Sequence, residues 1–225
     1  MNKQQLGVMR ARIEAEMNPP CALVVTSACE KDGKSLVASS LALSLSKSGH
    51  RVLLIDAADV TVSDRWPASA PKLSALANYD INSYVTRGRL GAFDYLGLWS
   101  EGVGDSSSSE NVRSTLARLK ERYDYVVVDT SPAQRNSLSL AFAAAAEATL
   151  VSLRLGRAAV SADRDLVSAL KSVGAKILGV VTTDARTVAA FNTAQRKDAR
   201  APGARAVLDD TAMSGTTPVR ASLVK

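Results

Sequence analysis

One eight-residue segment near the amino terminus combines residue types that can bind phosphate, and it reads Ala28-Cys29-Glu30-Lys31-Asp32-Gly33-Lys34-Ser35. A Gly-Lys-Ser triplet that opens a helix brings backbone N–H donors, the helix dipole and a lysine cation to a chain of phosphates. We expect Lys34 to reach the β- and γ-phosphates and the Ser35 hydroxyl to bind Mg²⁺. Ala28 replaces the usual first glycine of this loop, so the alternative is an ordinary helix start with an exposed Lys34.

Two aspartates, Asp56 and Asp129, each follow a short apolar run of the kind that forms a buried strand. Carboxylates at strand ends suit the Mg²⁺ that accompanies a nucleotide. We expect Asp129 to hold Mg²⁺ through water, and Asp56 to orient or deprotonate a nucleophile. The predicted catalytic residues are Lys34, Asp56 and Asp129, and the predicted metal site consists of Ser35, Asp56 and Asp129.

The elements that would position these residues alternate between strands and helices. Apolar runs predict strands at 21–25, 51–55, 93–98, 125–128, 148–153 and 176–181. Helical periodicity predicts helices at 3–17, from Lys34 to Gly49, and at 73–79, 110–121, 135–146 and 158–172. This order predicts an α/β fold with a mostly parallel central sheet. Together with the Gly33-Lys34-Ser35 loop and the acids at two strand ends, it predicts a three-layer α/β/α P-loop NTPase. Ligands of such sheets bind outside the carboxyl ends of the strands, where the phosphate loop and both aspartates would converge.

The composition fits one folded unit with tails. The chain has 225 residues, 46% of them hydrophobic, and a net charge of +6. We expect an N-terminal helix in 1–20, a P-loop domain in 21–184, and a basic tail in 185–225 that is largely disordered after a short helix. The tail holds seven Lys or Arg and three Asp or Glu, which is +4 of the total charge. Without a secretory signal or membrane-length apolar run, we expect a cytoplasmic protein with reduced cysteines.

Four segments together resemble the MinD/ParA-like P-loop ATPases, and within them the bacterial tyrosine kinases of capsule and exopolysaccharide systems. They are Val24–Ser27 with Asp32–Ser35, then Arg51–Asp56, Arg122–Pro132 and Gly174–Val181, and the resemblance covers about residues 4–184. It implies ATP and Mg²⁺ as cofactors, with Ala28 to Ser35 around the phosphates and Thr182 and Asp184 near the adenine. It also implies a role in exopolysaccharide or capsule synthesis and export, and a membrane-embedded co-polymerase as partner.

Several residues depart from the pattern of that family. Cys29 stands where ParA and MinD proteins carry a signature lysine, which favours the kinase branch. Glu30 and Lys31 replace a Pro-Gly pair, and Lys31 is expected to offset the charge of Glu30. In the segment Asp56-Ala57-Ala58-Asp59-Val60, the usual second acid is missing or displaced by one position and the usual basic residue is absent. None of the five tyrosines follows Tyr125. These departures count against tyrosine autophosphorylation more than against ATP binding.

Other functions stay open on the sequence alone. A ParA/MinD-like positioning ATPase would bind DNA or membrane through the basic tail. The missing signature lysine counts against this function, and nucleic acid is not the expected partner. A degenerate, non-catalytic scaffold would explain the eroded second motif. A homo-oligomer is also open. Self-assembly through the first helix is not expected, because only Arg10 matches the assembly pattern that the kinases place there. Arg154 and Arg157, next to a strand end at the nucleotide edge, are candidates to contact phosphate or a partner subunit.

Overall fold

The computed structural model describes residues 3–58, 81–89, 92–98, 109–157, 160–200 and 221–222. The strands are β1 (Cys21–Thr26), β2 (Val52–Ala57), β3 (Thr86–Arg89), β4 (Phe93–Gly97), β5 (Tyr125–Thr130), β6 (Ala148–Arg154), β7 (Ile177–Thr183) and β8 (Ala221–Ser222). The α-helices are α1 (Lys3–Glu16), α2 (Lys34–Lys47), α4 (Ser109–Lys120), α5 (Ser137–Ala145), α6 (Val160–Ser172) and α7 (Ala185–Arg200). A 3₁₀ helix, η1, spans Ile81–Tyr84.

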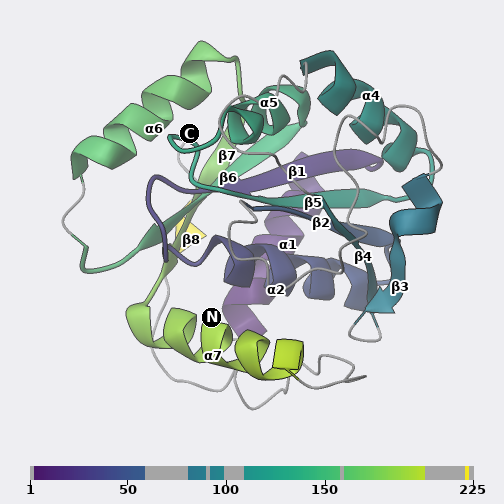
Figure 1. Cartoon of the computed structure of the whole chain (residues 1–225), viewed down its shortest axis with the longest axis horizontal. Coiled ribbons are helices and arrows are strands. Elements are labelled where there is room, and N and C mark those ends of the chain that lie inside the picture. Colours follow the sequence, from purple (N-terminus) through teal and green to yellow (C-terminus); the bar gives the residue numbers. More distant parts are fainter. Residues whose placement is uncertain are drawn as a thin grey trace.

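These strands form one sheet in the order β3-β4-β2-β5-β1-β6-β7-β8. The six strands from β4 to β7 in that order pair in parallel, and β3 and β8 join the two edges antiparallel. Helices α4, α5 and α6 lie on one face, and α1, α2 and α7 lie on the other (Figure 1). The prediction of a three-layer α/β/α fold with a mostly parallel sheet is therefore confirmed.

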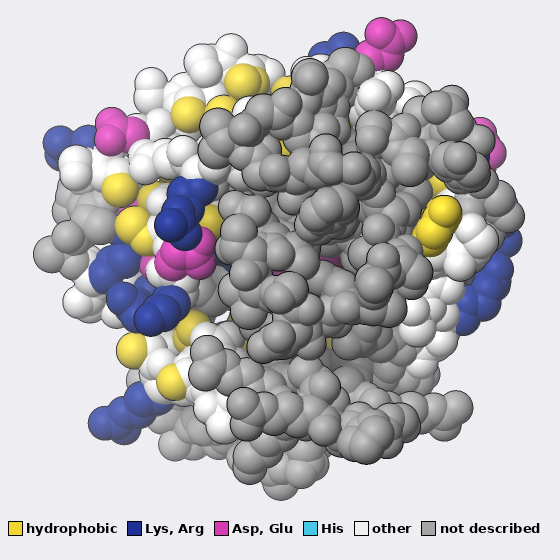
Figure 2. Space-filling model, viewed as in Figure 1, with side chains coloured by type: hydrophobic (Ala, Val, Ile, Leu, Met, Phe, Trp, Pro, Cys, Tyr) yellow, Lys and Arg dark blue, Asp and Glu magenta, His cyan; other side chains and the backbone are white. Residues whose placement is uncertain are grey.

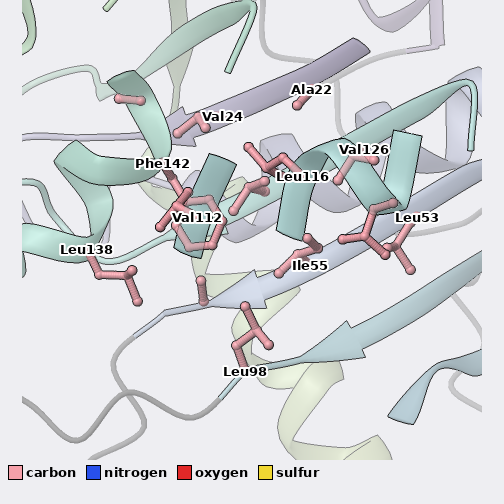
Figure 3. Packing of buried hydrophobic residues seen from close by; sticks show 14 of the residues in the cluster. Ala22, Val24, Leu53, Ile55, Leu98, Val112, Leu116, Val126, Leu138 and Phe142 are labelled. Atoms are coloured by element: carbon pink, nitrogen blue, oxygen red, sulfur yellow. The ribbon is translucent and has the colours of Figure 1, made fainter. Parts of the chain in front are cut away.

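Each face of the sheet has its own apolar core, because alternate side chains of a strand point to opposite faces. On one face, Phe142 of α5 and Val112 and Leu116 of α4 pack over strand residues such as Ile55 and Val126 (Figure 3). On the other face, α1 and α2 pack over the alternate residues of the same strands, including Leu23 and Val127. This alternation decides which face each polar residue at a strand end occupies.

The two helices at the borders of the predicted domain pack with the rest of the fold. Leu6, Met9, Ile13 and Met17 of the N-terminal segment are buried in the same core as α2. In α7, Val188 and Phe191 are buried against Leu36 of α2. The predicted tail thus begins with a helix that joins the core, while 201–220 and 223–225, where disorder is predicted, lie outside the described residues.

Within the described residues, the predicted strands and helices are found with small shifts at their ends, and three short elements, η1, β3 and β8, are additions. The helix predicted at 73–79 lies outside the described residues. In the part of the chain that the structure describes, no helix combines the length and apolar character needed to cross a bilayer.

Candidate functional site

The phosphate loop follows β1 at the carboxyl edge of the sheet, where the two predicted acids also lie. Asp56 is paired in register with Asp129 on the neighbouring strand, and Asp129 is paired with Val25 of β1. Counting alternate residues along β2 and β5 places both carboxylates on the face covered by α2. The helix that begins with Lys34 and Ser35 therefore starts on the same face, beside two adjacent carboxylates. The structure brings together the three parts that the sequence predicted.

The backbone of the loop is bent through two left-handed residues, Lys31 (φ 63°) and Gly33 (φ 83°). Gly33 also occupies the N-cap of α2. Between them, the Asp32 carbonyl accepts hydrogen bonds from the hydroxyls of Ser152 (2.5 Å) and Thr183 (2.9 Å). Side chains near the carboxyl ends of β6 and β7 thus hold the backbone of the loop in place. This fixes the direction of the first turn of α2, which is the part of a P-loop that receives phosphate.

Gly33 is required by its surroundings as well as by its backbone. A Cβ placed on this residue would lie 2.9 Å from side-chain methyl carbons of both Thr183 and Val188. We predict that Gly33→Ala lowers the free energy of unfolding by about 1–3 kcal/mol, from left-handed strain and crowding together. Gly49→Ala is the matched control, because Gly49 has a φ of 91° but nothing within 4 Å of its Cβ position. Equal losses in denaturant titrations of the two variants would contradict the crowding at Gly33.

Asp32 and Arg157 form a buried ion pair beneath the loop. Arg157 Nε lies 2.9 Å from Asp32 Oδ1, with 8% of the arginine side chain and none of the aspartate side chain exposed. Arg157 also donates to Cys29 Sγ at 3.3 Å and pairs with Asp163 of α6. Burial raises the pKa of Asp32, against the opposing effect of Arg157 beside it. Arg157, a candidate phosphate ligand on the sequence, is instead engaged by two carboxylates and fastens the loop to α6.

Glu30 is paired with a residue that the sequence did not single out. Arg135 Nη1 lies 2.9 Å from Glu30 Oε1, and the two side chains are 66% and 55% exposed. Arg135 belongs to the segment between β5 and α5, immediately before Asn136, whose side chain caps α5. The partner of Glu30 in the structure is therefore Arg135, whereas Lys31 was expected to offset its charge. The sequence marks Arg135 only as a cation six residues after Asp129, which does not identify Glu30 as its partner.

The two acids differ in their surroundings. Asp129 is buried, with 2% exposed. Asp56 is half-buried, accepting a hydrogen bond from the backbone N–H of Ala58 (3.1 Å) and another from the Tyr95 hydroxyl (3.3 Å). In the described part of the chain, no three His, Cys, Asp or Glu side chains gather into a metal site. Two carboxylates and a serine hydroxyl suit Mg²⁺, which is commonly bound by one or two carboxylates together with phosphate oxygens and water.

The residues predicted for the adenine end lie on the opposite side of the loop, at the end of β7. Asp184 caps α7, accepting hydrogen bonds from the Thr187 backbone N–H (2.9 Å) and hydroxyl (2.5 Å). Burial raises the pKa of Asp184, but the hydrogen bonds from Thr187 and Arg186 outweigh it and hold the pKa below its ordinary value. A cavity of about 250 Å³ lies beside this cap, lined by Lys31, Arg154, Ala185, Val188, Ala189, Asn192 and Thr193.

Comparison with curated proteins finds similarity to tyrosine-protein kinases. The tyrosine-protein kinase CpsD of Streptococcus agalactiae is 22% identical over 188 residues, which cover 80% of this chain and 82% of CpsD. CapB of Staphylococcus aureus, named in the same class, is 23% identical over 182 residues and 78% of each chain. No protein-family model matches the chain.

Solved structures share the fold at low sequence identity. The kinase domain of the Escherichia coli tyrosine kinase ETK superposes with a TM-score of 0.67 at 24% identity, covering 80% of this chain and 74% of that one. Cobyrinic acid a,c-diamide synthase of Mycobacterium smegmatis, solved with an ATP analogue and magnesium, gives 0.62 at 19% identity, over 78% and 80%. A plasmid partition protein from Borrelia burgdorferi gives 0.57 at 22% identity, over 72% and 78%. The chain is thus a low-identity relative of the bacterial tyrosine-protein kinases, with a P-loop fold that ParA-like ATPases share.

Proposed function

We propose that this chain binds ATP and Mg²⁺ at the loop Ala28–Ser35. The observation that carries the proposal is the convergence of this loop with Asp56 and Asp129 on the α2 face of the sheet edge. Lys34 would pair with the β- and γ-phosphates, and Ser35 would contribute its hydroxyl to the cation. The bound Mg²⁺ would neutralise charge on the phosphates. Thr182 and Asp184 stand at the far end of the site, where the nucleoside would lie.

We further propose that the chain is a kinase-like component of exopolysaccharide or capsule biosynthesis and export, acting at the cytoplasmic face of the membrane. The support is its similarity to tyrosine-protein kinases over about four-fifths of its length. A membrane-embedded co-polymerase is the expected partner. Three tyrosines, Tyr95, Tyr123 and Tyr125, are buried, and burial raises the pKa of both Tyr123 and Tyr125 to about 12. These three are poor phosphate acceptors, so the acceptor is expected elsewhere, with the partner as the first candidate.

A ParA/MinD-like positioning ATPase is the second candidate, favoured by the shared fold of the Borrelia partition protein. The structure gives a reason to rank it lower. At the position of the signature lysine, Cys29 receives a hydrogen bond from Arg157 within the buried ion-pair network. The Cys29 side chain therefore takes part in the contacts that hold the loop in place. It provides no cation that could reach a nucleotide. Salt-dependent binding of DNA or anionic vesicles by the chain, lost on deleting residues 186–225, would restore this candidate.

Turnover of γ-labelled ATP with Mg²⁺ tests whether the site is catalytic. We predict that Asp56→Asn lowers the rate of phosphate release or transfer by about 10²- to 10⁴-fold, the usual contribution of a general base. The affinity for ATP should change much less, because Lys34 and the loop remain. Asp94→Asn is the matched control: Asp94 is a carboxylate on the adjacent strand β4 that accepts from the Tyr123 hydroxyl at 2.9 Å. Neither hydrolysis nor transfer by the wild type would leave a non-catalytic nucleotide-binding scaffold as the function.

A further inference from the structure

Two arginines touch the phosphate loop, and they differ in their freedom to move. Arg157 is buried beneath the loop, whereas Arg135 is 66% exposed and meets Glu30 at the solvent-facing side. An exposed ion pair contributes little to stability because water competes for both ends. The Arg135 guanidinium can therefore leave Glu30 at small cost when a stronger anion arrives. This makes the Glu30–Arg135 pair, and not the Asp32–Arg157 pair, a candidate to respond to a ligand.

The backbone that carries Arg135 is tied to the base of the phosphate loop. Ala133 N–H donates to the Ser27 carbonyl (3.2 Å), and the Thr130 hydroxyl donates to the Val25 carbonyl (3.1 Å). The turn that follows closes with a hydrogen bond from Arg135 N–H to the Pro132 carbonyl (2.9 Å). The Cα of Arg135 is thus fixed next to the loop while its long side chain remains solvent-exposed.

The strand order shows which end of a nucleotide Arg135 would meet. In the sheet, β5 and β2, with both acids, lie on one side of β1, and β6 and β7 lie on the other side. Asp56 and Asp129 would hold the cation that neutralises the β- and γ-phosphates, which would put the terminal phosphate on the β5 side. Arg135 projects from the segment that directly follows β5. Charged side chains of both signs gather at the left of the view, toward which the carboxyl ends of β1 and β2 point (Figures 1 and 2).

We propose that Arg135 recognises the terminal phosphate of a nucleoside triphosphate by exchanging Glu30 for a phosphate oxygen. This inference rests on the proposed function. Glu30 would repel an incoming polyphosphate, and its guanidinium partner presents parallel N–H donors that fit a phosphate as well as a carboxylate. In the nucleotide-free protein, the ion pair with Glu30 keeps the Arg135 guanidinium next to the phosphate loop. With a triphosphate bound, Arg135 supplies the positive charge at the γ-phosphate, and a diphosphate lacks the group that it would contact.

The test is the ratio of affinities for Mg-ATP and Mg-ADP, measured by calorimetry on the full chain. Arg135→Ala is expected to weaken ATP binding about tenfold, the effect of one lost charged contact, and to leave ADP binding nearly unchanged. Arg135→Lys should retain part of the preference, because it keeps the charge without the planar fork. Glu30→Gln should strengthen ATP binding by releasing Arg135 and removing the repulsion. Arg113→Ala, an exposed arginine on α4, is the control and should leave both affinities unchanged.

The outcomes separate this inference from the proposed function. If the wild type binds ATP, Lys34→Ala does not, and Arg135→Ala keeps the wild-type ratio of affinities, then the role of Arg135 is wrong and the nucleotide site stands. A Glu30→Gln variant with unchanged ATP affinity would contradict the exchange of partners. If the wild type binds neither nucleotide, both proposals fail together. Thermal unfolding of Arg135→Ala should match the wild type, since an exposed pair adds little stability.

Discussion

Lys34→Ala is expected to weaken the binding of Mg-ATP by about 30- to 4,000-fold. Lys34 is buried, with 7% of the residue exposed. It is the first residue of α2 and directly follows the left-handed N-cap residue Gly33. Loss of one partner of a desolvated, hydrogen-bonded charge pair costs about 2–5 kcal/mol, and each 1.4 kcal/mol changes Kd about tenfold. Isothermal titration calorimetry of the wild type and the variant measures the difference directly.

Lys47→Ala provides a control for Lys34→Ala, because it removes a lysine from the other end of the same helix. The affinity of the control for Mg-ATP should equal that of the wild type. Circular dichroism should show that both variants keep their helices and strands. Wild-type affinity in a folded Lys34→Ala variant would mean that the loop binds no phosphate through this lysine.

Arg157→Ala is expected to lower the free energy of unfolding by about 3–5 kcal/mol, the usual cost of removing one partner of a buried ion pair. The variant leaves Asp32 fully buried without its guanidinium, and it also removes the contacts of Arg157 with Cys29 and Asp163. Chemical denaturation followed by circular dichroism measures the loss. We also expect weaker Mg-ATP binding, because the loop would no longer be fastened to α6.

Arg135→Ala is the matched control for stability, because it breaks an exposed pair made by the same loop and should cost about 0–1 kcal/mol. The double variant Asp32→Asn with Arg157→Met removes both charges and should be more stable than Arg157→Ala alone. If Arg157→Ala and Arg135→Ala cost the same, the buried pair does not support the loop in the way that the structure indicates.

The central strands could be predicted from the sequence because burial on both faces leaves a clear mark. The runs at β1, β2 and β5 are almost entirely apolar, and the aspartates of β2 and β5 fall next to the last residue of each strand. The helical spacing of Leu6, Met9, Ile13 and Met17 likewise predicted the buried side of the N-terminal helix. From these segments alone, the phosphate loop, Asp56 and Asp129 could be assigned to one edge of one sheet.

The edge strands could not be predicted, for a physical reason. Thr86-Arg87-Gly88-Arg89 contains no apolar side chain, and β8 consists of Ala221 and Ser222 only. Such strands are held by backbone hydrogen bonds to a neighbour, which leave no hydrophobic pattern in the sequence. The amino-acid sequence alone therefore predicted the interior of the sheet better than its borders.

The ion pairs of the site were also beyond sequence reasoning. Asp32 and Arg157 are separated by 125 positions in the chain, and Glu30 and Arg135 by 105. A pair of opposite charges at such distances has no periodic signal, and only the fold shows which arginine is buried. The packing of α7 against α2 depends on Val188 and Phe191, within a segment whose positive charge suggested a solvated tail.

Calorimetric titration of the wild-type chain with ATP, with and without Mg²⁺, tests the central claim most directly. The structure places a phosphate loop, a buried lysine and two adjacent carboxylates at one edge of the sheet. It therefore predicts saturable binding at one site per chain that weakens when Mg²⁺ is removed with EDTA. No saturable binding at millimolar ATP, in a chain shown to be folded, would contradict the account.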